Sequence, residues 1–274
     1  MKFNRRYEHK YRIDLFTYYK IKMYLKPYIN NDNFTGKTKN GKYLVRSLYF
    51  DNDSLEAFFE KENGNWGRIK FRIRSYKEKV EDTDVLNFEL KTKKGNLMEK
   101  YGQFISVKDY KLFMDGKYTI QPNNKFMTEV ERLRGVRKLK PILIVEYERE
   151  GFVSKIKEEK TRITFDHNIK YARSNELFPS FLNYRKRIEN DIILEIKNQK
   201  ELPIWLSKMI KMYQLKEISN SKFTYGMMVI NNDIITINKN KKMLLGIEKS
   251  KRVKEPILES DFKSEVAKVD EVKC

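Results

Sequence analysis

Apolar and polar residues alternate along eight segments of the chain, the pattern typical of half-buried β-strands. The segments are Tyr7–Ile13, Leu44–Asp51, Arg68–Tyr76, Leu86–Lys93, Lys100–Ile105, Ile142–Phe152, Thr161–Lys170 and Ile192–Lys197. Apolar residues recur at helical spacing in Asp14–Tyr28, Ser54–Glu62, Val107–Met114, Lys125–Lys138 and Pro203–Met212. Strands and helices do not alternate one for one, which disfavours a doubly wound parallel sheet. The pattern predicts an α+β fold, an eight-stranded, mostly antiparallel closed β-barrel (a tunnel) with helices packed outside.

Charged residues occupy one face of several predicted strands, because residues two apart in a strand point to the same side. Lys70, Arg72 and Arg74 share such a face, opposite Phe71 and Ile73. Charged faces usually point to solvent. Exposed faces normally mix both signs, however, and like charges on neighbouring strands repel. This all-positive row therefore favours a channel that binds a polyanion.

Single carboxylates lie among the other charged strand faces, at Glu8, Glu89 and Glu195. Arginine and lysine hold phosphate groups, and carboxylate oxygens are ligands of divalent cations. The combination predicts an anion-binding channel that also holds a divalent metal. The opposite, apolar faces would need a second apolar layer, which the apolar stripes of the helices can supply.

Composition limits the alternatives. Lysine and arginine number 58 against 38 acidic residues, for a net charge of +20. Residues 231–274 are nearly balanced, so the excess belongs to a single predicted domain, 1–230, followed by a charged, flexible tail, 231–274. One cysteine and two histidines exclude a disulfide scaffold, a cysteine-rich zinc site and a multi-histidine metal site. Without a signal peptide or a long apolar segment, a cytoplasmic location is expected.

Glycine-rich phosphate loops of the GxxxxGK[ST] or GxGxxG type are missing from the sequence, as is HExxH. Side chains would therefore have to hold any bound phosphate. Eight segments, RYEHKYRI (6–13), RSLYFDN (46–52), KFRIRSY (70–76), FELKTK (88–93), VEYEREGF (145–152), RITFDHNI (162–169), ILEIK (193–197) and SNSKFTYG (219–226), occur in that order. Over residues 3–230 the series resembles the VTC-type polyphosphate polymerase domain of the triphosphate tunnel metalloenzyme superfamily.

The resemblance implies a tunnel of eight antiparallel strands in which the terminal phosphate of ATP is added to a growing polyphosphate chain. It implies a divalent metal cofactor, Mn²⁺ or Mg²⁺. The residues then expected to act in catalysis are Lys10, Arg72, Arg74, Lys91 and Arg149, those expected to bind substrate are Arg46, Tyr147, Arg162, Lys197 and Lys222, and the expected metal ligands are Glu195 and Glu89. The first strand holds one glutamate, Glu8, where the hydrolase branch has ExExK. This departure favours a polymerase and leaves the role of Glu8 open.

Three other functions stay open on the sequence alone. A hydrolase of the same fold would cleave tripolyphosphate or thiamine triphosphate, or act as a cyclase. A second alternative is a polyphosphate sensor without activity. The third is a nucleic-acid-binding module, which is disfavoured because the positive charges lie in strand rows with carboxylates between them. The expected partners are ATP and polyphosphate, with a separate membrane protein if the product is exported, and the basic surface suits association with the periphery of an anionic membrane.

Overall fold

The structure is a computed structural model that describes residues 7–95, 97–121, 123–186, 192–199 and 201–231. Its strands are β1 (Tyr7–Ile13), β2 (Ile29–Asn31), β3 (Tyr43–Asp51), β4 (Gly67–Ser75), β5 (Val85–Lys94), β6 (Leu97–Ser106), β7 (Lys140–Ser154), β8 (Arg162–Arg173) and β9 (Ile192–Asn198). Its α-helices are α1 (Leu15–Leu25), α2 (Glu56–Glu62), α3 (Val107–Met114), α4 (Lys125–Val136), α5 (Ile204–Met212) and α6 (Lys222–Ile230). Short 3₁₀ helices, η1 (Thr35–Lys37) and η2 (Lys157–Glu159), follow β2 and β7. All eight predicted strands and five predicted helices are present, whereas β2 and α6 were not predicted.

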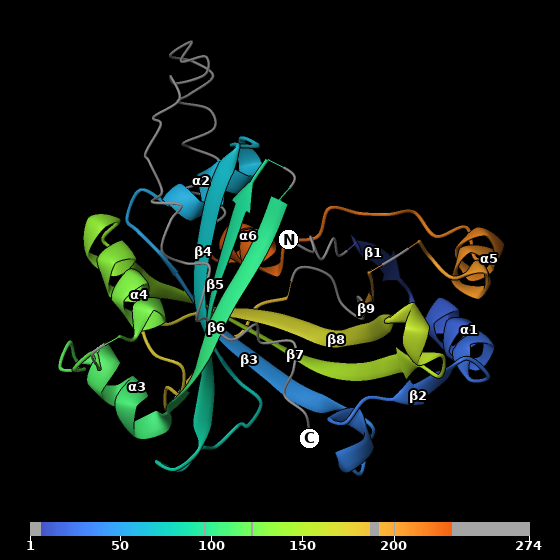
Figure 1. Cartoon of the computed structure of the whole chain (residues 1–274), viewed down its shortest axis with the longest axis horizontal. Coiled ribbons are helices and arrows are strands. Elements are labelled where there is room, and N and C mark those ends of the chain that lie inside the picture. The colour runs from blue at the N-terminus through green and yellow to red at the C-terminus, as the bar shows by residue number, and fades with distance from the viewer. Residues whose placement is uncertain (1–6, 96, 122, 187–191, 200, 232–274) are drawn as a thin grey trace.

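All nine strands form one antiparallel sheet in the order β1-β9-β8-β7-β3-β4-β5-β6, with β2 paired to β7 beside this order. The sheet curls, so that β4, β5 and β6 run across the direction of β7 and β8 (Figure 1). Strands β1 and β6 are its two ends, and no ladder of hydrogen bonds joins them within the described ranges. The prediction of an antiparallel α+β fold is confirmed, but the barrel is an open, curved sheet and is not closed by hydrogen bonds.

The outer face of the sheet carries two apolar clusters under four helices. At one end, α3 and α4 cover β4 and β5, where Phe113 of α3 lies 6.1 Å from Phe71 and 5.2 Å from Phe88 between ring centroids. At the other end, α1 and α5 cover β1, β8 and β9, with Ile21 and Leu206 fully buried. Figure 1 shows the two helix pairs at opposite ends of the molecule. The apolar faces of β1, β4, β5, β8 and β9 thus point outward into a helix layer, as the alternation predicted, and their charged faces point inward.

Helices α2 and α6 pack against the concave inner face. Phe58 of α2 and Phe223 of α6 share one apolar cluster with Val45 of β3 and Tyr147 of β7. In α6, a Cβ added at Gly226 would lie 2.7 Å from side-chain atoms of both Leu143 and Tyr171. A side chain at position 226 would therefore push the helix away from the sheet. Only glycine lets α6 lie this close to β7 and β8.

Two side chains that precede α2 in the chain hold the start of this helix. The carboxylate of Asp51, fully buried at the end of β3, accepts hydrogen bonds from the backbone N–H groups of Ala57 and Phe58 at 2.9 and 3.1 Å. The side chain of Asn52 accepts the N–H of Glu56 at 3.0 Å. The first turn of α2 is therefore held by Asp51 at the buried end of β3 and by the adjacent Asn52.

No helix in the described part of the chain is long and apolar enough to cross a membrane. The predicted tail, apart from Asn231, lies outside the described residues.

Candidate functional site

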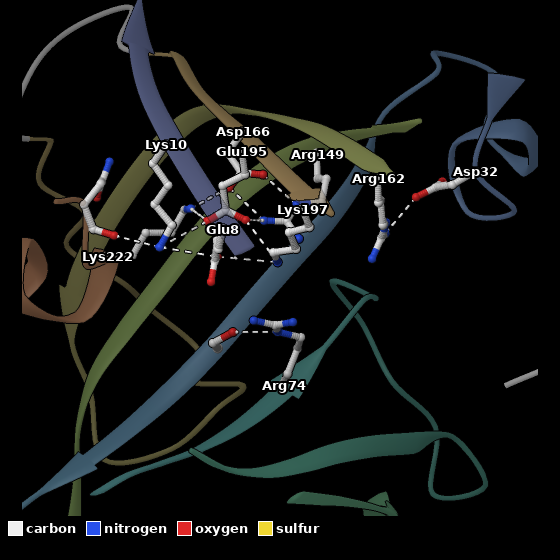
Figure 2. Close-up of polar contacts among 12 residues, drawn as sticks. Glu8, Lys10, Asp32, Arg74, Arg149, Arg162, Asp166, Glu195, Lys197 and Lys222 are labelled. Atoms are coloured by element: carbon white, nitrogen blue, oxygen red, sulfur yellow. Dashed lines mark hydrogen bonds and ion pairs between the residues drawn. The ribbon is translucent and has the colours of Figure 1, made fainter. Parts of the chain in front are cut away.

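Ionisable side chains from seven strands, β1 and β4 to β9, and from helix α6 meet on the concave face of the sheet. They follow the alternation seen in the sequence, because every second residue of β1, β4, β5, β8 and β9 points inward. Figure 2 shows one group of them between β1, β8 and β9, with Arg74 of β4 across from it. The inward charges form two clusters, each centred on one buried glutamate.

The first group, called here the Glu195 cluster, contains the residues Glu8, Lys10, Arg149, Asp166, Glu195, Lys197 and Lys222. The carboxylate of Glu195 lies 3.7 Å from the Nζ of Lys10, 3.3 Å from that of Lys197 and 3.6 Å from that of Lys222. Arg149 lies 3.6 Å from the same carboxylate. One carboxylate is thus surrounded by cations from three strands and from the N-terminal turn of α6.

Asp166 holds two of these cations in place. Arg149 donates a pair of hydrogen bonds to its carboxylate, at 2.6 and 2.8 Å, and the Nζ of Lys222 lies 2.5 Å from it. Asp166 itself is fully buried. Because a bidentate carboxylate fixes the plane of a guanidinium, Asp166 orients Arg149 toward Glu195.

The carboxylates of this cluster are ionised at neutral pH. Burial opposes ionisation of Glu195, but Lys197, Lys222, Lys10 and Arg149 together hold its pKa well below the usual 4.5. Burial and the charge of Glu195 raise the pKa of Glu8, while Lys197, Lys10 and Lys91 lower it, and the result is about 2. Burial likewise opposes ionisation of Asp166, and Arg149 and Lys222 lower its pKa. The lysines are attracted to fixed negative charge and are pre-positioned around it.

The second group, called here the Glu89 cluster, contains Arg72, Arg74, Glu89 and Lys100. The Nε of Arg72 lies 2.5 Å from Glu89 and a terminal nitrogen of Arg74 lies 3.7 Å from it, while Lys100 forms a further ion pair with it. Burial opposes ionisation of Glu89, but these three cations hold its pKa well below the usual value. The predicted row of positive charge on β4 therefore faces a shared, buried carboxylate rather than solvent.

Tyr147 and Lys91 lie between the two clusters. The ring of Tyr147 has Arg149 at 5.2 Å and Lys222 at 4.8 Å from its centroid, and the tyrosine also acts electrostatically on Arg72 and Arg74. Burial lowers the pKa of Lys91 to about 7, with Glu8 opposing that shift and Arg72, Lys197 and Lys10 adding to it. Lys91 therefore responds to charges of both clusters.

Lys70, the next inward residue of β4, has a pKa of about 7 for a similar reason. Burial lowers it, and so do Lys61 and Arg68. The inner face thus carries more positive charge than its own carboxylates offset. An arriving anion would relieve that excess.

Two predicted substrate-binding residues lie apart from the clusters. Arg46 is on the opposite face of β3 from Ser47, whose hydroxyl accepts a hydrogen bond from Arg74 at 3.2 Å. Its Nε donates to Glu146 at 2.5 Å, and Glu146 also accepts the hydroxyl of Tyr184. Strand alternation places Arg46 on the outer face of β3, so the prediction that it binds substrate on the inner face is wrong.

Arg162 does point inward but lies at the end of β8, turned toward Asp32 (Figure 2). It donates to Asp32 at 2.8 Å and to the hydroxyl of Tyr43 at 3.2 Å. The remaining predicted residues, Lys10, Arg72, Arg74, Lys91, Tyr147, Arg149, Lys197 and Lys222, are all brought to the inner face by the elements described above.

The two predicted metal ligands lie in different clusters, Glu89 with the arginines of β4 and Glu195 with the lysines of β1 and β9. Glu8 is a more suitable partner for Glu195, because both carboxylates contact the same two lysines: Glu8 lies 3.4 Å from Lys10 and 3.6 Å from Lys197. The described residues contain no group of three or more histidine, cysteine, aspartate or glutamate side chains arranged to hold a metal ion. Two carboxylates fit a cation that takes its other oxygen ligands from a bound phosphate chain.

Sequence reasoning missed two participants. Asp166 shares its strand face with Arg162 and Thr164, but nothing along the sequence shows that its partner is Arg149 on the neighbouring strand. Lys100 faces Lys91 across the β5–β6 ladder, and only the strand register reveals that it reaches Glu89. Lys222 was expected from the resemblance, but the helix that places it was not.

Comparison with known proteins agrees with this geometry. A family model described as VTC domain matches residues 5–231. No curated protein matches the sequence. Among solved structures, a candidate adenylate cyclase from Bacillus halodurans is similar at 15% identity and a TM-score of 0.50, over 78% of this chain and 92% of that one. At this identity the likeness concerns the fold alone.

Two further structures are similar over comparable lengths. A candidate adenylyl cyclase from Hippeastrum, described as having a dominant triphosphatase activity, is 10% identical with a TM-score of 0.44, over 80% of this chain and 95% of that one. The PH1819 protein from Pyrococcus horikoshii is 12% identical with a TM-score of 0.44, over 81% and 97%. The family model spans most of the chain, and the inward-facing charges lie on a curved antiparallel sheet. The chain therefore belongs to the VTC domain family, and its fold is similar to that of the Bacillus halodurans structure.

Proposed function

We propose that the protein is an ATP-dependent polyphosphate polymerase, which transfers the terminal phosphate of ATP to the end of a polyphosphate chain. The observation that carries the proposal is the excess of inward-facing lysine and arginine over carboxylate on one concave face. A chain of phosphates carries negative charge at every unit, so it complements a row of cations better than a compact anion does. Membership of the VTC domain family supports the same substrate class.

The two clusters suit different parts of the reaction. Arg72 and Arg74 offer planar guanidinium groups, which bind phosphate oxygens in pairs. Lys10, Lys197 and Lys222 offer mobile point charges around Glu195. In phosphoryl transfer the protein contributes mainly alignment and charge neutralisation. Tyr147 and Lys91, which lie between the clusters, are then nearest to where the donor and acceptor phosphates would meet.

The transfer forms a bond from a terminal oxygen of the polyphosphate chain to the γ-phosphorus of ATP. It breaks the bond between that phosphorus and the β–γ bridging oxygen, and ADP leaves with the bond's electron pair. The acceptor oxygen is already ionised near neutral pH, so no side chain has to remove a proton. This agrees with a site built mainly from arginine, lysine and ionised carboxylate side chains.

A divalent cation, Mn²⁺ or Mg²⁺, is expected to be held by Glu195 and Glu8 together with phosphate oxygens, and it would supply additional charge neutralisation. Lys10 and Lys197 contact both carboxylates in the structure. These lysines would turn from the carboxylates to the phosphates of a bound nucleotide. The chain itself therefore contributes lysines that lie beside the two proposed metal-binding carboxylates and that these carboxylates do not fully neutralise.

The test is to incubate the full chain with ATP and Mn²⁺ or Mg²⁺ and to stain the products for polyphosphate on a gel. Long chains are expected, together with one ADP for each phosphate incorporated. Release of orthophosphate alone would make the protein a hydrolase of the same fold. Binding of polyphosphate without consumption of ATP would make it a sensor.

A matched pair of lysine variants separates the inner face from general basicity. Lys222→Met removes a cation that contacts both Asp166 and Glu195, and we expect polymer formation to fall about 100-fold or more, as when one donor to a reacting oxygen is lost. Lys117→Met removes an exposed lysine after α3 and should leave the rate unchanged. Equal activity of the two variants would contradict the assignment.

A further inference from the structure

Helix α1 is apolar on both of its sides. Tyr18, Ile21 and Leu25 face the sheet and are almost fully buried. On the other side, Phe16 is 69% exposed and Met23 is 77% exposed. Leu15 and Tyr19 of the same side are 52% and 58% exposed. A surface helix normally carries polar residues on its outer side, so an apolar outer side indicates a further contact.

The charges beside this outer side are positive. At 100° per residue, Leu15, Tyr19, Met23 and Phe16 fall within one arc, and Lys26 and Lys20 lie inside or beside that arc. Lys20 lies 4.0 Å from the centroid of the Phe16 ring. The helix itself, Leu15–Leu25, contains no acidic residue. The carboxylate of Asp14, at its N-cap, accepts a hydrogen bond from the backbone N–H of Thr17 at 2.8 Å. Phenylalanine, tyrosine and leucine next to lysine are typical of helices that lie in a membrane interface.

Two neighbouring elements extend this surface at the same end of the molecule, where Figure 1 shows α1 and α5 side by side. Tyr28, just after α1, stacks on Trp205 of α5 with ring centroids 4.9 Å apart. The Nζ of Lys155, in the turn between β7 and β8, donates to the backbone oxygen of Pro27 at 2.9 Å. Ile204 of α5 and Ile156 of the turn are 75% and 54% exposed.

Among the described residues, the same three elements and their flanks carry seven exposed lysines: Lys20, Lys26, Lys155, Lys157, Lys160, Lys208 and Lys211. The exposed carboxylates of the same three elements and their flanks are Asp14, Glu158 and Glu201. We call the exposed residues of α1, α5 and the β7–β8 turn the α1 end. It combines large apolar side chains with an excess of positive charge.

We propose that the α1 end docks on the surface of an anionic membrane, with Phe16, Tyr19 and Met23 entering the interface and the lysines contacting lipid headgroups. Charge decides between the candidate occupants. In a symmetric contact with a second copy, the same lysines would face one another, and like charges repel. An anionic lipid surface satisfies both properties at once, because each lysine near it contributes to attraction while the apolar side chains are buried.

The docking surface is separate from the inner face. The α1 end belongs to the outer cluster under α1 and α5, whereas the phosphate-binding clusters lie on the concave side of the sheet. Docking therefore leaves the site open to substrate and depends on no step of the proposed reaction. It would place polyphosphate formation next to a membrane.

The test is co-sedimentation of the full chain with two kinds of vesicle. One kind is phosphatidylcholine alone, and the other also contains about 30% phosphatidylglycerol. We expect binding to the anionic vesicles only, weakened by salt. The double variant Phe16→Ser with Met23→Ser should lower the binding at least about tenfold, and Lys20→Gln and Lys26→Gln about fivefold each. Phe181→Ser, at a position 80% exposed on a different part of the surface, is the matched apolar control and should bind as the parent chain does.

Three outcomes would overturn the proposal. The first is absence of binding to anionic vesicles. The second is equal binding by the Phe16→Ser, Met23→Ser variant. The third is a change in oligomeric state of that variant in sedimentation velocity without vesicles, which would assign the face to a protein partner. As controls, the variants should unfold at the same urea concentration as the parent chain and should form polyphosphate at the same rate without vesicles. A loss of vesicle binding then reflects neither misfolding nor a damaged inner face.

Discussion

The glutamate at the centre of each cluster offsets part of the repulsion between the cations around it, but it does not neutralise all of them. Glu195 is contacted by three lysines and one arginine, and Glu89 by two arginines and one lysine. Several cations sharing one carboxylate keep a net positive charge that is already oriented. A phosphate chain that binds there, as we propose, would exchange existing ion pairs instead of ordering free side chains, which would lower the free-energy cost of binding.

Lys91 is expected to report the arrival of a polyanion by taking up a proton. Burial holds its pKa at about 7 in the ligand-free protein, with Arg72, Lys197 and Lys10 adding to the shift and Glu8 opposing it. At pH 8 the amine is therefore largely neutral, and bound phosphates would raise its pKa and protonate it. We expect proton uptake on tripolyphosphate binding at pH 8, and an affinity that falls as the pH rises from 7 to 9.

Calorimetry at pH 8 in buffers of different ionisation enthalpy measures this uptake. Lys91→Arg provides the comparison, because arginine stays charged at every pH used. Its uptake should be smaller, with Lys70, whose pKa is also about 7, accounting for the remainder. Identical uptake by the parent chain and by Lys91→Arg would show that Lys91 is not the group that titrates.

The sequence predicted the positions of site residues where strand alternation alone decides which way a side chain points. It placed Lys70, Arg72 and Arg74 on one face, and that face is the inner one. Arg46 was expected to bind substrate only because of the family resemblance. The alternation of β3 places it on the opposite face from Ser47 and so argues against that role. The pairing of Asp166 with Arg149 depends on register between strands, which a single strand cannot reveal.

At the scale of elements, α6 connects the fold with the site. Its N-cap Ser221 accepts the N–H of Thr224 at 3.3 Å, so the helix starts where Lys222 meets Asp166 and Glu195. The segment was not predicted as a helix, since glycine and threonine are weak helix formers and its apolar residues show no clear stripe. Packing against β7 and β8 decides its structure.

Gly226→Ala is expected to reduce activity by displacing α6. The new Cβ would lie 2.7 Å from Leu143 and Tyr171, so the helix must move outward and take Lys222 with it. We expect a loss of about 1–3 kcal/mol in unfolding free energy, despite the better helix propensity of alanine, and at least a tenfold lower rate of polyphosphate formation.

Gly135→Ala in α4 is the matched control for that substitution. No atom lies within 4 Å of the Cβ it would add. It should stabilise the protein by about 0.5–1 kcal/mol and leave the rate unchanged, which urea unfolding and the gel assay measure. A Gly226→Ala protein as stable and active as its parent would contradict the close approach of α6.

Helix α1 is joined to the sheet by a buried carboxylate, Glu150 of β7. It accepts the hydroxyl of Tyr18 at 2.6 Å and the Nζ of Lys22 at 2.8 Å, and the Nε2 of His167 lies 3.4 Å away. Burial opposes its ionisation, but His167, Lys22 and Tyr18 lower its pKa to about 2. The attachment therefore contributes fully above pH 4.5 and weakens as the pH falls toward 2.

Glu150→Gln should lower the unfolding free energy by about 2–4 kcal/mol at pH 7, since it leaves Lys22 without its charged partner. The difference from the parent chain should narrow as the pH falls from 4.5 toward 2, because the parent loses the same charge. Urea unfolding at several pH values measures this. Asp82→Asn, an exposed partner of Lys111, should change stability by less than about 0.5 kcal/mol, and a constant difference at all pH values would argue against the role of Glu150.

For the whole molecule, net charge sets how binding depends on salt. The chain carries +20, and the inner face adds local positive charge that its carboxylates do not offset. Affinity for polyphosphate should fall steeply as salt rises from about 0.1 to 1 M, because the Debye length shrinks from about 10 to about 3 Å. The fall should be larger for long chains than for tripolyphosphate, since long chains contact more cations.

Competition binding with labelled polyphosphate at a series of KCl concentrations measures the effect. The control is Lys117→Gln, which changes an exposed lysine just after α3, the helix on the outer side of the sheet, and should leave the salt dependence unchanged. Lys197→Gln should reduce the salt dependence, because Lys197 belongs to the Glu195 cluster. Affinity independent of salt would contradict recognition by charge.

The sequence by itself determined the strands and the faces on which charge and apolar residues lie, because both depend on a period of two along a single segment. It also predicts that side chains hold any bound phosphate, since the sequence has no glycine-rich phosphate loop. Only the tertiary structure decided that β1 and β6 leave the sheet open, that α6 enters the concave side, and that Glu8 rather than Glu89 accompanies Glu195. These features depend on contacts between residues far apart in the chain, and their geometry is set by how segments pack against one another.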